Sequence, residues 1–281
     1  MKPRQNPLID LAAVAGYSFY LLSHVVFSAL VVPVFLVLYP FGRLRHIFIR
    51  RVFGWYVHFL THVYLPLLRV YRIAEISGFE QADNHRPAVY VANHRSRIDG
   101  PFLLGIIRGA GVLIKTNYAR NPLYTGLVKY LDFVSVDSRA FNSLLDALED
   151  AKRLLSQGKN LLVFPEGTRS LTGRLLPFRD MAFRIAMAAR VPVIPVVIHS
   201  DVPFMGKRRG SLFPGKTFTF TVRCLEPLYA GPDDRPADLA ERAAAAIEKE
   251  LVGLDTDTPW QIDARNAERA IKPRRYGAAG M

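Results

Sequence analysis

Short apolar runs rich in β-branched residues alternate with longer helical patterns over most of this chain. Five such runs after position 73 have the length and composition of buried strands: "AVYVAN" (88–93), "GVLIK" (111–115), "FVSV" (133–136), "NLLVF" (160–164) and "VPVIPVVI" (191–198). Strands that alternate with helices favour a mostly parallel sheet flanked by helices. The sequence therefore predicts an α/β fold.

The helical pattern between the third and fourth runs extends from Phe141 to Gln157, and Gly158 is expected to end it. Further along, "TFTFTVRC" (217–224) is typical of a strand near the sheet edge, and "PADLAERAAAAIEKEL" (236–251) predicts a helix before a basic tail. In the first of these helices one face is apolar and is expected in the core: Leu144, Leu145, Leu148, Ala151, Leu154 and Leu155.

The N-terminal part of the chain has a different composition. The run from Leu11 to Gly42 contains no Lys, Arg, Asp or Glu, and it is longer than the ~20 apolar residues that a spanning helix needs. A second apolar stretch, from Val52 to Arg72, carries Trp, Tyr and His, which are typical of the headgroup level of a membrane. We expect a membrane-associated pair of helices over 11–39 and 43–70, with Pro33 bending the first.

Basic residues flank the apolar run on both sides, at Lys2 and Arg4 before it and at Arg43 and Arg45 after it. Because such residues stay on the cytoplasmic side, a hairpin that enters one leaflet and returns would place both flanks there. The alternative is one transmembrane helix followed by a helix buried in the globular domain. The chain is thus divided into membrane-associated helices (1–72), an α/β domain (73–231) and a C-terminal helix with a basic tail (232–281).

The chain is strongly basic, with a formal net charge of +13 and a pI near 10.0. Such a charge suits nucleic acid, an anionic membrane surface or phosphate-bearing ligands. The apolar stretches favour the last two, and no nucleic-acid-reading motif is visible, so we expect an anionic membrane surface and no nucleic acid as partner. The single cysteine, Cys224, leaves no internal disulfide and no Cys/His cluster for zinc, so no metal is expected.

Two short motifs stand at the ends of predicted strands. "NHRSRID" (93–99) contains His94 and Asp99 five positions apart, a spacing that chance gives in roughly one chain in three of this composition. "FPEGTRS" (164–170) follows the fourth strand, and its first six letters arise by chance on the order of once in 100,000 such chains. The second motif is therefore far more informative than the first.

Together with the following "VPVIPVVI", these motifs resemble the lysophospholipid acyltransferase family typified by 1-acylglycerol-3-phosphate acyltransferase. The resemblance runs from about Ser77 to Pro203 and includes the block "IKTNYARNPLYTGLVKYLDFVSVDSR" (114–139). The hydrophobic leader is also usual in that family. The sequence departs from the pattern at three positions where small residues, often glycine, are expected: Asp132, Met181 and Arg190.

His94 and Asp99 are interpreted as a general base and the carboxylate that orients it. On a continuous helix, positions five apart point about 140° from one another, so a turn must separate them. A strand that ends at Asn93 and a helix that begins near Gly100 and Pro101 would let His94 fold back toward Asp99 at the carboxyl edge of the sheet. Asp99 would fix the tautomer while the other ring nitrogen removes a proton from an acceptor hydroxyl. The plainer alternative is a core histidine beside a helix cap.

The "FPEGTRS" loop is interpreted as an anion site. Gly167 would let the backbone approach a phosphate, Arg169 would offer a planar fork, Thr168 would add a hydroxyl contact, and Glu166 would orient Arg169 or a substrate hydroxyl. The resemblance implies that this loop and Lys115 bind the phosphate of a lysolipid. On charge alone, Lys115 is almost as well explained as a solvated strand end.

Arg95 and Arg97 lie on either side of the histidine motif's serine, where related sequences often have a neutral or aromatic residue. Two interpretations stand side by side for these arginines. They bind an anionic headgroup, or they only face acidic lipid.

The resemblance implies a membrane-bound O-acyltransferase that moves an acyl chain from acyl-CoA or acyl carrier protein to the free hydroxyl of lysophosphatidic acid, giving phosphatidic acid. It implies direct transfer without an acyl-enzyme and no cofactor beyond the acyl donor. The catalytic domain is expected on the cytoplasmic side of the cytoplasmic (inner) membrane. Two alternatives stay open: the same chemistry on another acceptor, such as a lyso-aminolipid or a specialised metabolite, or a non-catalytic lipid-binding membrane adaptor.

Overall fold

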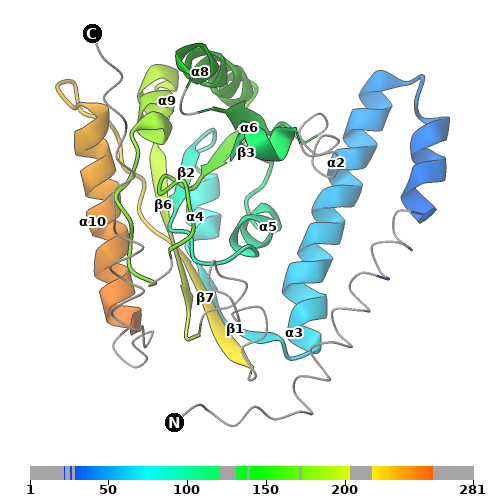
Figure 1. The fold of residues 1–281 in the computed structure, drawn as a ribbon, viewed down its shortest axis with the longest axis horizontal. Helices are drawn as coiled ribbons and strands as arrows, with labels where there is room; N and C mark the ends of the chain where they lie inside the picture. The colour runs from blue at the N-terminus through cyan, green and yellow to red at the C-terminus, as the bar shows by residue number, and fades with distance from the viewer. Residues whose placement is uncertain are drawn as a thin grey trace.

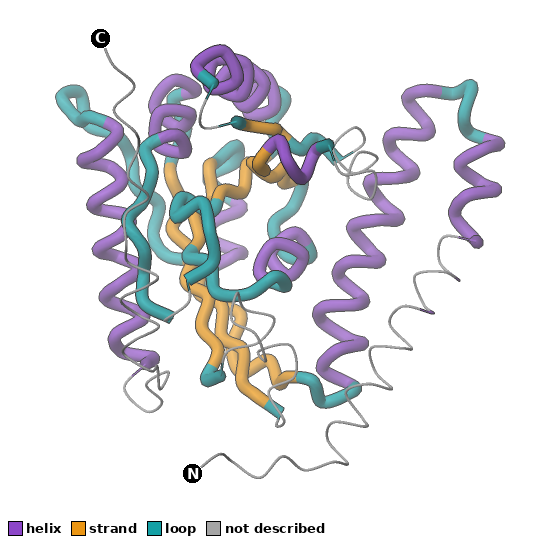
Figure 2. Tube along the Cα trace, in the orientation of Figure 1, coloured by secondary structure: helices purple, strands orange, loops and turns teal. Residues whose placement is uncertain are grey.

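The computed structural model describes residues 29–120, 131–137, 140–170, 173–202 and 217–255, and the single positions 22 and 26. Its centre is a seven-stranded sheet in the order β1-β7-β6-β2-β5-β3-β4 (Figures 1 and 2). The strands are β1 (Tyr71–Ser77), β2 (Val89–Ala92), β3 (Ala110–Lys115), β4 (Val134–Val136), β5 (Asn160–Val163), β6 (Val193–Ser200) and β7 (Phe218–Cys224).

The five strands predicted from apolar runs are all present as β2 to β6. β2 pairs with β5 and β6, and β3 pairs with β4 and β5, in every case in parallel. Every residue of β2, β5 and β6 is buried, because helices cover both faces of a parallel sheet. The predicted α/β fold with a mostly parallel sheet is confirmed.

The remaining two strands form one side of the sheet. β7, predicted near the edge, lies beside the edge strand β1 and runs antiparallel to β6, while β1 is parallel to β7. The sequence did not reveal β1 as a strand. Its buried and more exposed residues alternate and include Arg72 and Glu75, so it lacks the continuous apolar run of the central strands.

Helices cover both faces of the sheet (Figure 1). Successive residues of β2 point to opposite faces: Val89 and Val91 join the apolar core on one side, and Tyr90 and Ala92 join the core on the other. The first core is closed by α8 (Phe141–Ser156), α9 (Met181–Ala189) and α10 (Pro236–Asp255), and the second by α4 (Phe79–Asp83) and α5 (Asp99–Leu104). The four-residue helix α6 (Thr116–Ala119) directly follows β3.

Helix α8 confirms the predicted helix, but its buried face differs in part from the prediction. The buried residues are Ala147, Ala151, Leu154 and Leu155, which follow the spacing i, i+4, i+7, i+8 of a single apolar stripe. Leu145 was expected in this core and is instead 46% exposed. It stands two positions before Ala147 and therefore points to the opposite side of the helix. As predicted, Gly158 follows the helix in the left-handed conformation, with φ 72°.

Two N-terminal helical segments form a hairpin beside the α/β domain (Figure 1). Residues 29–37 are helical, and after a turn the chain returns as α2 (Gly42–His58), the π-helical segment η1 (Phe59–Tyr64) and the short α3 (Leu65–Leu67). The second predicted helix is confirmed in position, whereas its π-helical segment was not predicted. Most of the first predicted helix before residue 29, the block at 121–130, and the tail after 255 lie outside the described residues.

Ion pairs tie α2 to the domain. Arg50 donates to Asp132, and Lys159 Nζ lies 2.9 Å from the same carboxylate oxygen. The hairpin also exposes large apolar residues, among them Leu30, Leu36, Val37, Trp55 and Leu67. Within the described ranges, no helix has the length and apolar character needed to cross a membrane.

Two of the three departures from the family pattern occupy left-handed backbone. Asp132 has φ 57° and Arg190 has φ 54°, a conformation that glycine adopts without steric cost. Arg190 ends α9: its amide donates to Met187 O, and the Val191 amide donates to Ala186 O at 3.0 Å. This pattern is the helix ending in which glycine is strongly preferred. The third departure, Met181, is the first residue of α9.

Replacing Arg190 with glycine is therefore expected to raise the free energy of unfolding by about 0.5–1 kcal/mol. The Arg190 side chain is exposed, so little packing is lost with it. Urea denaturation of the purified protein measures the change. Arg190→Ala is the control, because it removes the same side chain and keeps the strained backbone; equal stability of the two variants would contradict the explanation.

Candidate active site

The two motifs meet at the carboxyl edge of the sheet because their strands are neighbours. β2 and β5 pair in parallel with Val91 opposite Val163, so the loops that begin two residues later leave the sheet side by side. β3 is the next strand, with Val112 opposite Leu162, and its last residue is Lys115. The tertiary structure thus brings "NHRSRID", "FPEGTRS" and Lys115 to adjacent positions along one edge.

Asn93 turns the chain out of the sheet at this edge. Its side-chain amide donates to Ile198 O at 2.8 Å, and its carbonyl oxygen accepts the Ile198 amide at 2.7 Å. The side chain therefore occupies both backbone hydrogen-bonding groups of Ile198 on β6. His94 is released into a loop while Asn93 stays fixed and buried.

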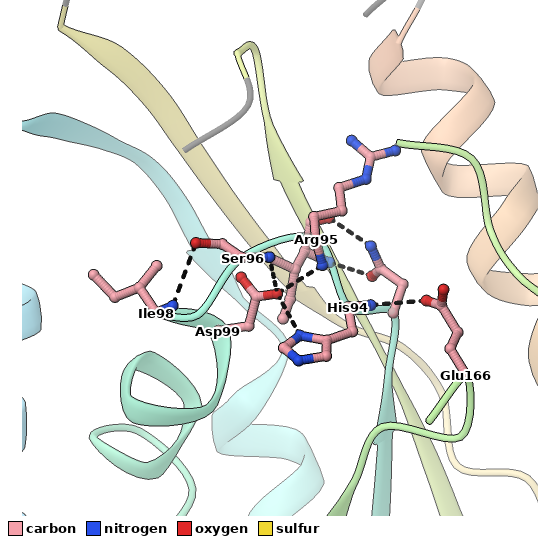
Figure 3. A network of polar contacts seen from close by, with 8 residues as sticks. His94, Arg95, Ser96, Ile98, Asp99 and Glu166 are labelled. Carbon is pink, nitrogen blue, oxygen red and sulfur yellow. Dashed lines mark hydrogen bonds and ion pairs between the residues drawn. The ribbon is translucent and has the colours of Figure 1, made fainter. Parts of the chain in front are cut away.

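His94 folds back onto Asp99, as expected (Figure 3). His94 Nδ1 lies 2.9 Å from Asp99 Oδ2, and the amides of Arg95 and Ser96 donate to the same oxygen at 2.8 and 2.7 Å. Asp99 is the first residue of α5 and its side chain is fully buried. Because a carboxylate only accepts, the proton of a neutral imidazole sits on Nδ1, and Nε2 is the basic nitrogen.

The ring of His94 is also held from its face. Phe164, the last residue before "PEG", stacks on it with ring centroids 4.2 Å apart and an interplanar angle of 28°. The His94 side chain keeps 21% of its surface exposed. Asp99 thus holds the imidazole at Nδ1 and Phe164 holds one face of the ring, while part of the ring remains accessible to a substrate.

Glu166 fastens the two loops together from a buried position. Its Oε1 accepts the His94 amide at 2.8 Å, and its Oε2 accepts the Leu176 amide at 3.2 Å. The Ser170 amide in turn donates to His94 O at 2.7 Å. These contacts show Glu166 as a support of the loop backbone, whereas its predicted contact with Arg169 or a substrate hydroxyl stays a prediction.

Burial raises the pKa of Glu166 from 4.5 to about 8. Loss of hydration is the largest cause. The His94 and Leu176 amides and the charge of Arg95 act in the opposite direction, and the Asp99 carboxylate adds to the rise. The hydrogen bonds that shape the loop thus join a carboxyl group that titrates close to neutral pH.

The rest of the "FPEGTRS" loop continues around His94. Gly167 has φ 64°, and an added Cβ would lie 3.1 Å from Arg179 Nε, so the backbone itself requires glycine here. Thr168 and Arg169 are half-buried, next to the buried Ser170. The loop therefore has the predicted glycine for a structural reason, and its predicted phosphate contacts stay predictions.

The three other predicted binding residues lie in different environments. Arg95 is only 2% exposed, so the interpretation that its side chain faces acidic lipid is wrong. Arg97 is exposed, and Lys115 is exposed at the end of β3. The structure thus places Arg97 and Lys115 at the surface and Arg95 in the interior.

Comparisons with known proteins identify the family of this chain. An acyltransferase family model matches residues 73–199, which include both motifs. The 1-acyl-sn-glycerol-3-phosphate acyltransferase alpha of Bos taurus is 31% identical over 228 residues, covering 79% of this chain and 75% of its own. The chain belongs to the 1-acyl-sn-glycerol-3-phosphate acyltransferase family. It is an O-acyltransferase of this type.

Two further relatives support the family and the fold. The human alpha enzyme of the same name is 31% identical over 204 residues, covering 70% of this chain and 69% of its own. The crystal structure of the 1-acyl-sn-glycerophosphate (LPA) acyltransferase PlsC from Thermotoga maritima has a TM-score of 0.64 and 22% identity, and covers 93% of this chain and 100% of its own. This last likeness shows that the acyltransferase shares the PlsC fold.

Sequence reasoning did not find the supporting residues of this acyltransferase site. Asn93, Phe164 and Ser170 belong to the quoted motifs, but their contacts join strands and loops that are far apart in the chain. The thiol of Cys224 is buried on β7, and burial raises its pKa to about 12, which makes Cys224 a poor nucleophile.

Replacing Glu166 with glutamine is expected to change how stability depends on pH. Between about pH 4.5 and pH 8 the folded state keeps a proton on Glu166 that the unfolded state has released, so the free energy of unfolding falls as pH rises through this interval. The contribution is on the order of a few kcal/mol and is lost in the variant.

Urea denaturation across about pH 5 to 9 measures this difference between wild type and Glu166→Gln. Glu80→Gln, on the exposed start of α4, is the matched control and should keep the wild-type slope. If Glu166→Gln showed the same pH slope as wild type, the carboxyl group would not titrate in the predicted interval.

Proposed function

We propose that this acyltransferase moves an acyl chain from a thioester donor, acyl-CoA or acyl carrier protein, to the free hydroxyl of lysophosphatidic acid, giving phosphatidic acid. The observation that carries the proposal is the 2.9 Å contact between His94 Nδ1 and the buried Asp99 carboxylate, beside the "FPEGTRS" loop. The names of the bovine and human relatives support lysophosphatidic acid as the acceptor.

In the proposed reaction, His94 Nε2 takes the proton of the acceptor hydroxyl while the oxygen attacks the thioester carbonyl carbon. A new carbon–oxygen bond forms, and the tetrahedral intermediate then breaks its carbon–sulfur bond. The imidazolium gives its proton to the departing thiolate. Asp99 stabilises the imidazolium between these two steps and keeps Nε2 directed at the substrate.

Transfer is direct, without an acyl-enzyme. The ordinary nucleophile for such an intermediate would be a thiolate or an activated hydroxyl. The buried Cys224, with a pKa of about 12, is poorly suited to that role. The proposed chemistry requires no cofactor beyond the acyl donor.

The acceptor phosphate is placed at the "FPEGTRS" loop. Arg169 supplies a bidentate fork, Thr168 supplies a hydroxyl, and Lys115 at the end of β3 supplies a second positive charge. The position of this loop supports the assignment, because Ser170 and Glu166 fix it directly to the backbone of His94. Arg97 belongs to the "NHRSRID" motif and is exposed, so it is suited to binding an anionic headgroup at the surface.

We place the protein at the cytoplasmic (inner) membrane, with the catalytic domain on the cytoplasmic side. Large apolar residues are exposed on the helical hairpin, and Arg43 and Arg51 are exposed beside them on α2. Apolar side chains with nearby arginines suit a helix that lies at the surface of an anionic membrane. The lipid acceptor and product would then enter and leave the site within the same leaflet.

Replacing His94 with alanine is expected to reduce acyl transfer about 100- to 10,000-fold. Asp99→Asn should also reduce the rate of acyl transfer, because an amide in place of the carboxylate no longer selects the productive tautomer or stabilises the imidazolium. The measurement uses detergent-solubilised full-length protein, labelled acyl-CoA and acyl carrier protein donors, and a panel of lysophospholipid acceptors.

His85→Ala is the control for loss of a histidine, since the His85 ring contacts Tyr229, which belongs to neither motif. Full activity in His94→Ala would refute the proposed base. Transfer only to another acceptor of the panel would support the same chemistry on a different lipid or metabolite. The absence of transfer from wild type to every acceptor would favour a lipid-binding adaptor.

Replacing Arg169 with alanine is expected to raise KM for lysophosphatidic acid about 10- to 100-fold, the loss of one charge-assisted contact. Monoacylglycerol, which lacks the phosphate, serves as the matched acceptor and should be used equally well by wild type and variant. Arg169→Lys should recover part of the loss, because it keeps the charge without the planar fork. An equal loss with both acceptors would place Arg169 outside the phosphate site.

A further inference from the structure

The helix α5 carries Asp99 at its first residue and is only six residues long. It lies between the sheet and α2 (Figure 1), and it contacts both α2 and η1. The hydrogen bonds of the Asp99 carboxylate hold the loop in front of the helix. The distance between Asp99 and His94 therefore depends also on the contacts that hold α5 in place.

His58, the last residue of α2, meets the far end of α5. Its Nδ1 lies 3.0 Å from Gly105 O, and Gly105 is the residue that follows the last turn of α5. A Cβ at Gly105 would lie 2.8 Å from His62 Cε1 and 3.2 Å from His58 Cα. The two helices are thus in direct contact at a point where no larger residue fits.

His62, within the π-helical segment η1, packs on the face of α5. Its ring centroid lies 4.2 Å from that of Phe102, which is fully buried three residues after Asp99, and the His58 and His62 rings stack at 4.5 Å. π-helical turns within α-helices are frequent at functional positions. The histidine pair therefore bounds α5 both at its end and on the side that faces α2.

The state of His62 is fixed by its surroundings. The Thr61 hydroxyl donates to Val57 O at 2.7 Å, so His62 Nδ1, 2.8 Å from Thr61 Oγ1, is placed as the donor in that contact. Burial and the nearby His58 lower the pKa of His62 to about 4. The ring is neutral near physiological pH, and its contact with Phe102 is one of packing and orientation.

A short helix transmits a displacement of one end to the other with little loss. With a rise of 1.5 Å per residue, the length of α5 is only about 8 Å. A misplacement of about 1 Å at a catalytic group costs on the order of 100-fold in rate. A small shift of Phe102 or Gly105 toward α2 would therefore be felt at the Asp99 carboxylate.

The geometry points to His58 and His62 as positioning residues that set Asp99 against His94 through α5. This inference rests on the proposed function of His94 and Asp99 and adds to it a coupling to the N-terminal hairpin. The same helix, α2, also exposes apolar and basic residues. The element that we place at the membrane surface thereby also positions the carboxylate of the reacting pair.

The test compares wild type with His62→Ala in full-length, detergent-solubilised protein. kcat is expected to fall about 10- to 100-fold with little change in KM for either substrate, because the binding loops are untouched. The acid limb of kcat/KM should move to lower pH, since a displaced Asp99 no longer stabilises the His94 imidazolium. The other charged groups around the pair, Glu166, Arg95, Arg97 and Arg169, are unchanged in the variant.

His62→Phe should restore most of kcat and the position of the acid limb, because an aromatic ring again packs against Phe102. His58→Ala changes an exposed residue and should lower kcat and move the acid limb in the same direction as His62→Ala, by a smaller amount. It takes the place of His62→Ala in the test if that variant does not fold. His85→Ala is the matched control and should behave as wild type. Urea denaturation of each variant separates loss of folded protein from loss of rate.

The NMR resonance of the His94 Nδ1 proton, assigned by comparison with His94→Ala, provides a readout that does not require activity. The resonance should move upfield in His62→Ala, because the hydrogen bond to Asp99 lengthens, and should return to its wild-type position in His62→Phe. If that resonance and the acid limb keep their wild-type positions in His62→Ala and His58→Ala, the coupling through α5 is refuted. If wild type transfers no acyl group but the resonance still moves in His62→Ala, the proposed function is refuted and the positioning role is supported.

Discussion

The backbone of His94 is fastened on both sides by the loop that follows β5. Its amide donates to Glu166 Oε1 at 2.8 Å, and its carbonyl accepts the Ser170 amide at 2.7 Å. The neighbouring parallel strands β2 and β5 make this possible, because the loops at their carboxyl ends start at the same level of the sheet. The stacking of Phe164 on the imidazole and the approach of the "FPEGTRS" loop to it depend on these two bonds.

Charged groups in the interior give the site its electrostatic character. Asp99, Glu166 and Arg95 are all buried, and each would be unfavourable there without polar partners. Asp99 is compensated by two backbone amides and an imidazole. Glu166 receives two amides and the field of Arg95, but loss of hydration still raises its pKa to about 8. One carboxyl group is thus arranged to orient a base, and the other to support a loop in a largely dehydrated position.

The N-terminal hairpin is part of the same assembly. Asp132 occupies left-handed backbone where the family pattern has small residues, and its carboxylate receives Arg50 of α2 and Lys159. Further along, His58 and His62 contact the helix that begins with Asp99. The hairpin is therefore fixed to the domain by these contacts, and those of His58 and His62 lead directly to the site. The helix that we place at the membrane and the catalytic pair that we propose are joined by side-chain packing over one short helix.

The sequence by itself determined the α/β class, the five strands β2 to β6, the long helix α8 and the two motifs, because these depend on local periodicity and on a short string of unusual composition. It missed β1, whose residues alternate, and it wrongly placed Leu145 in the core. For Arg95 it left open a lipid-facing alternative that burial excludes, because burial depends on neighbours that are distant in the chain. Only the tertiary structure decided that Glu166 supports the His94 backbone, that Phe164 holds the ring and that α2 reaches α5. Those contacts join segments separated by many residues, and the physical reason they form is the order and parallel register of the strands, which no local pattern specifies.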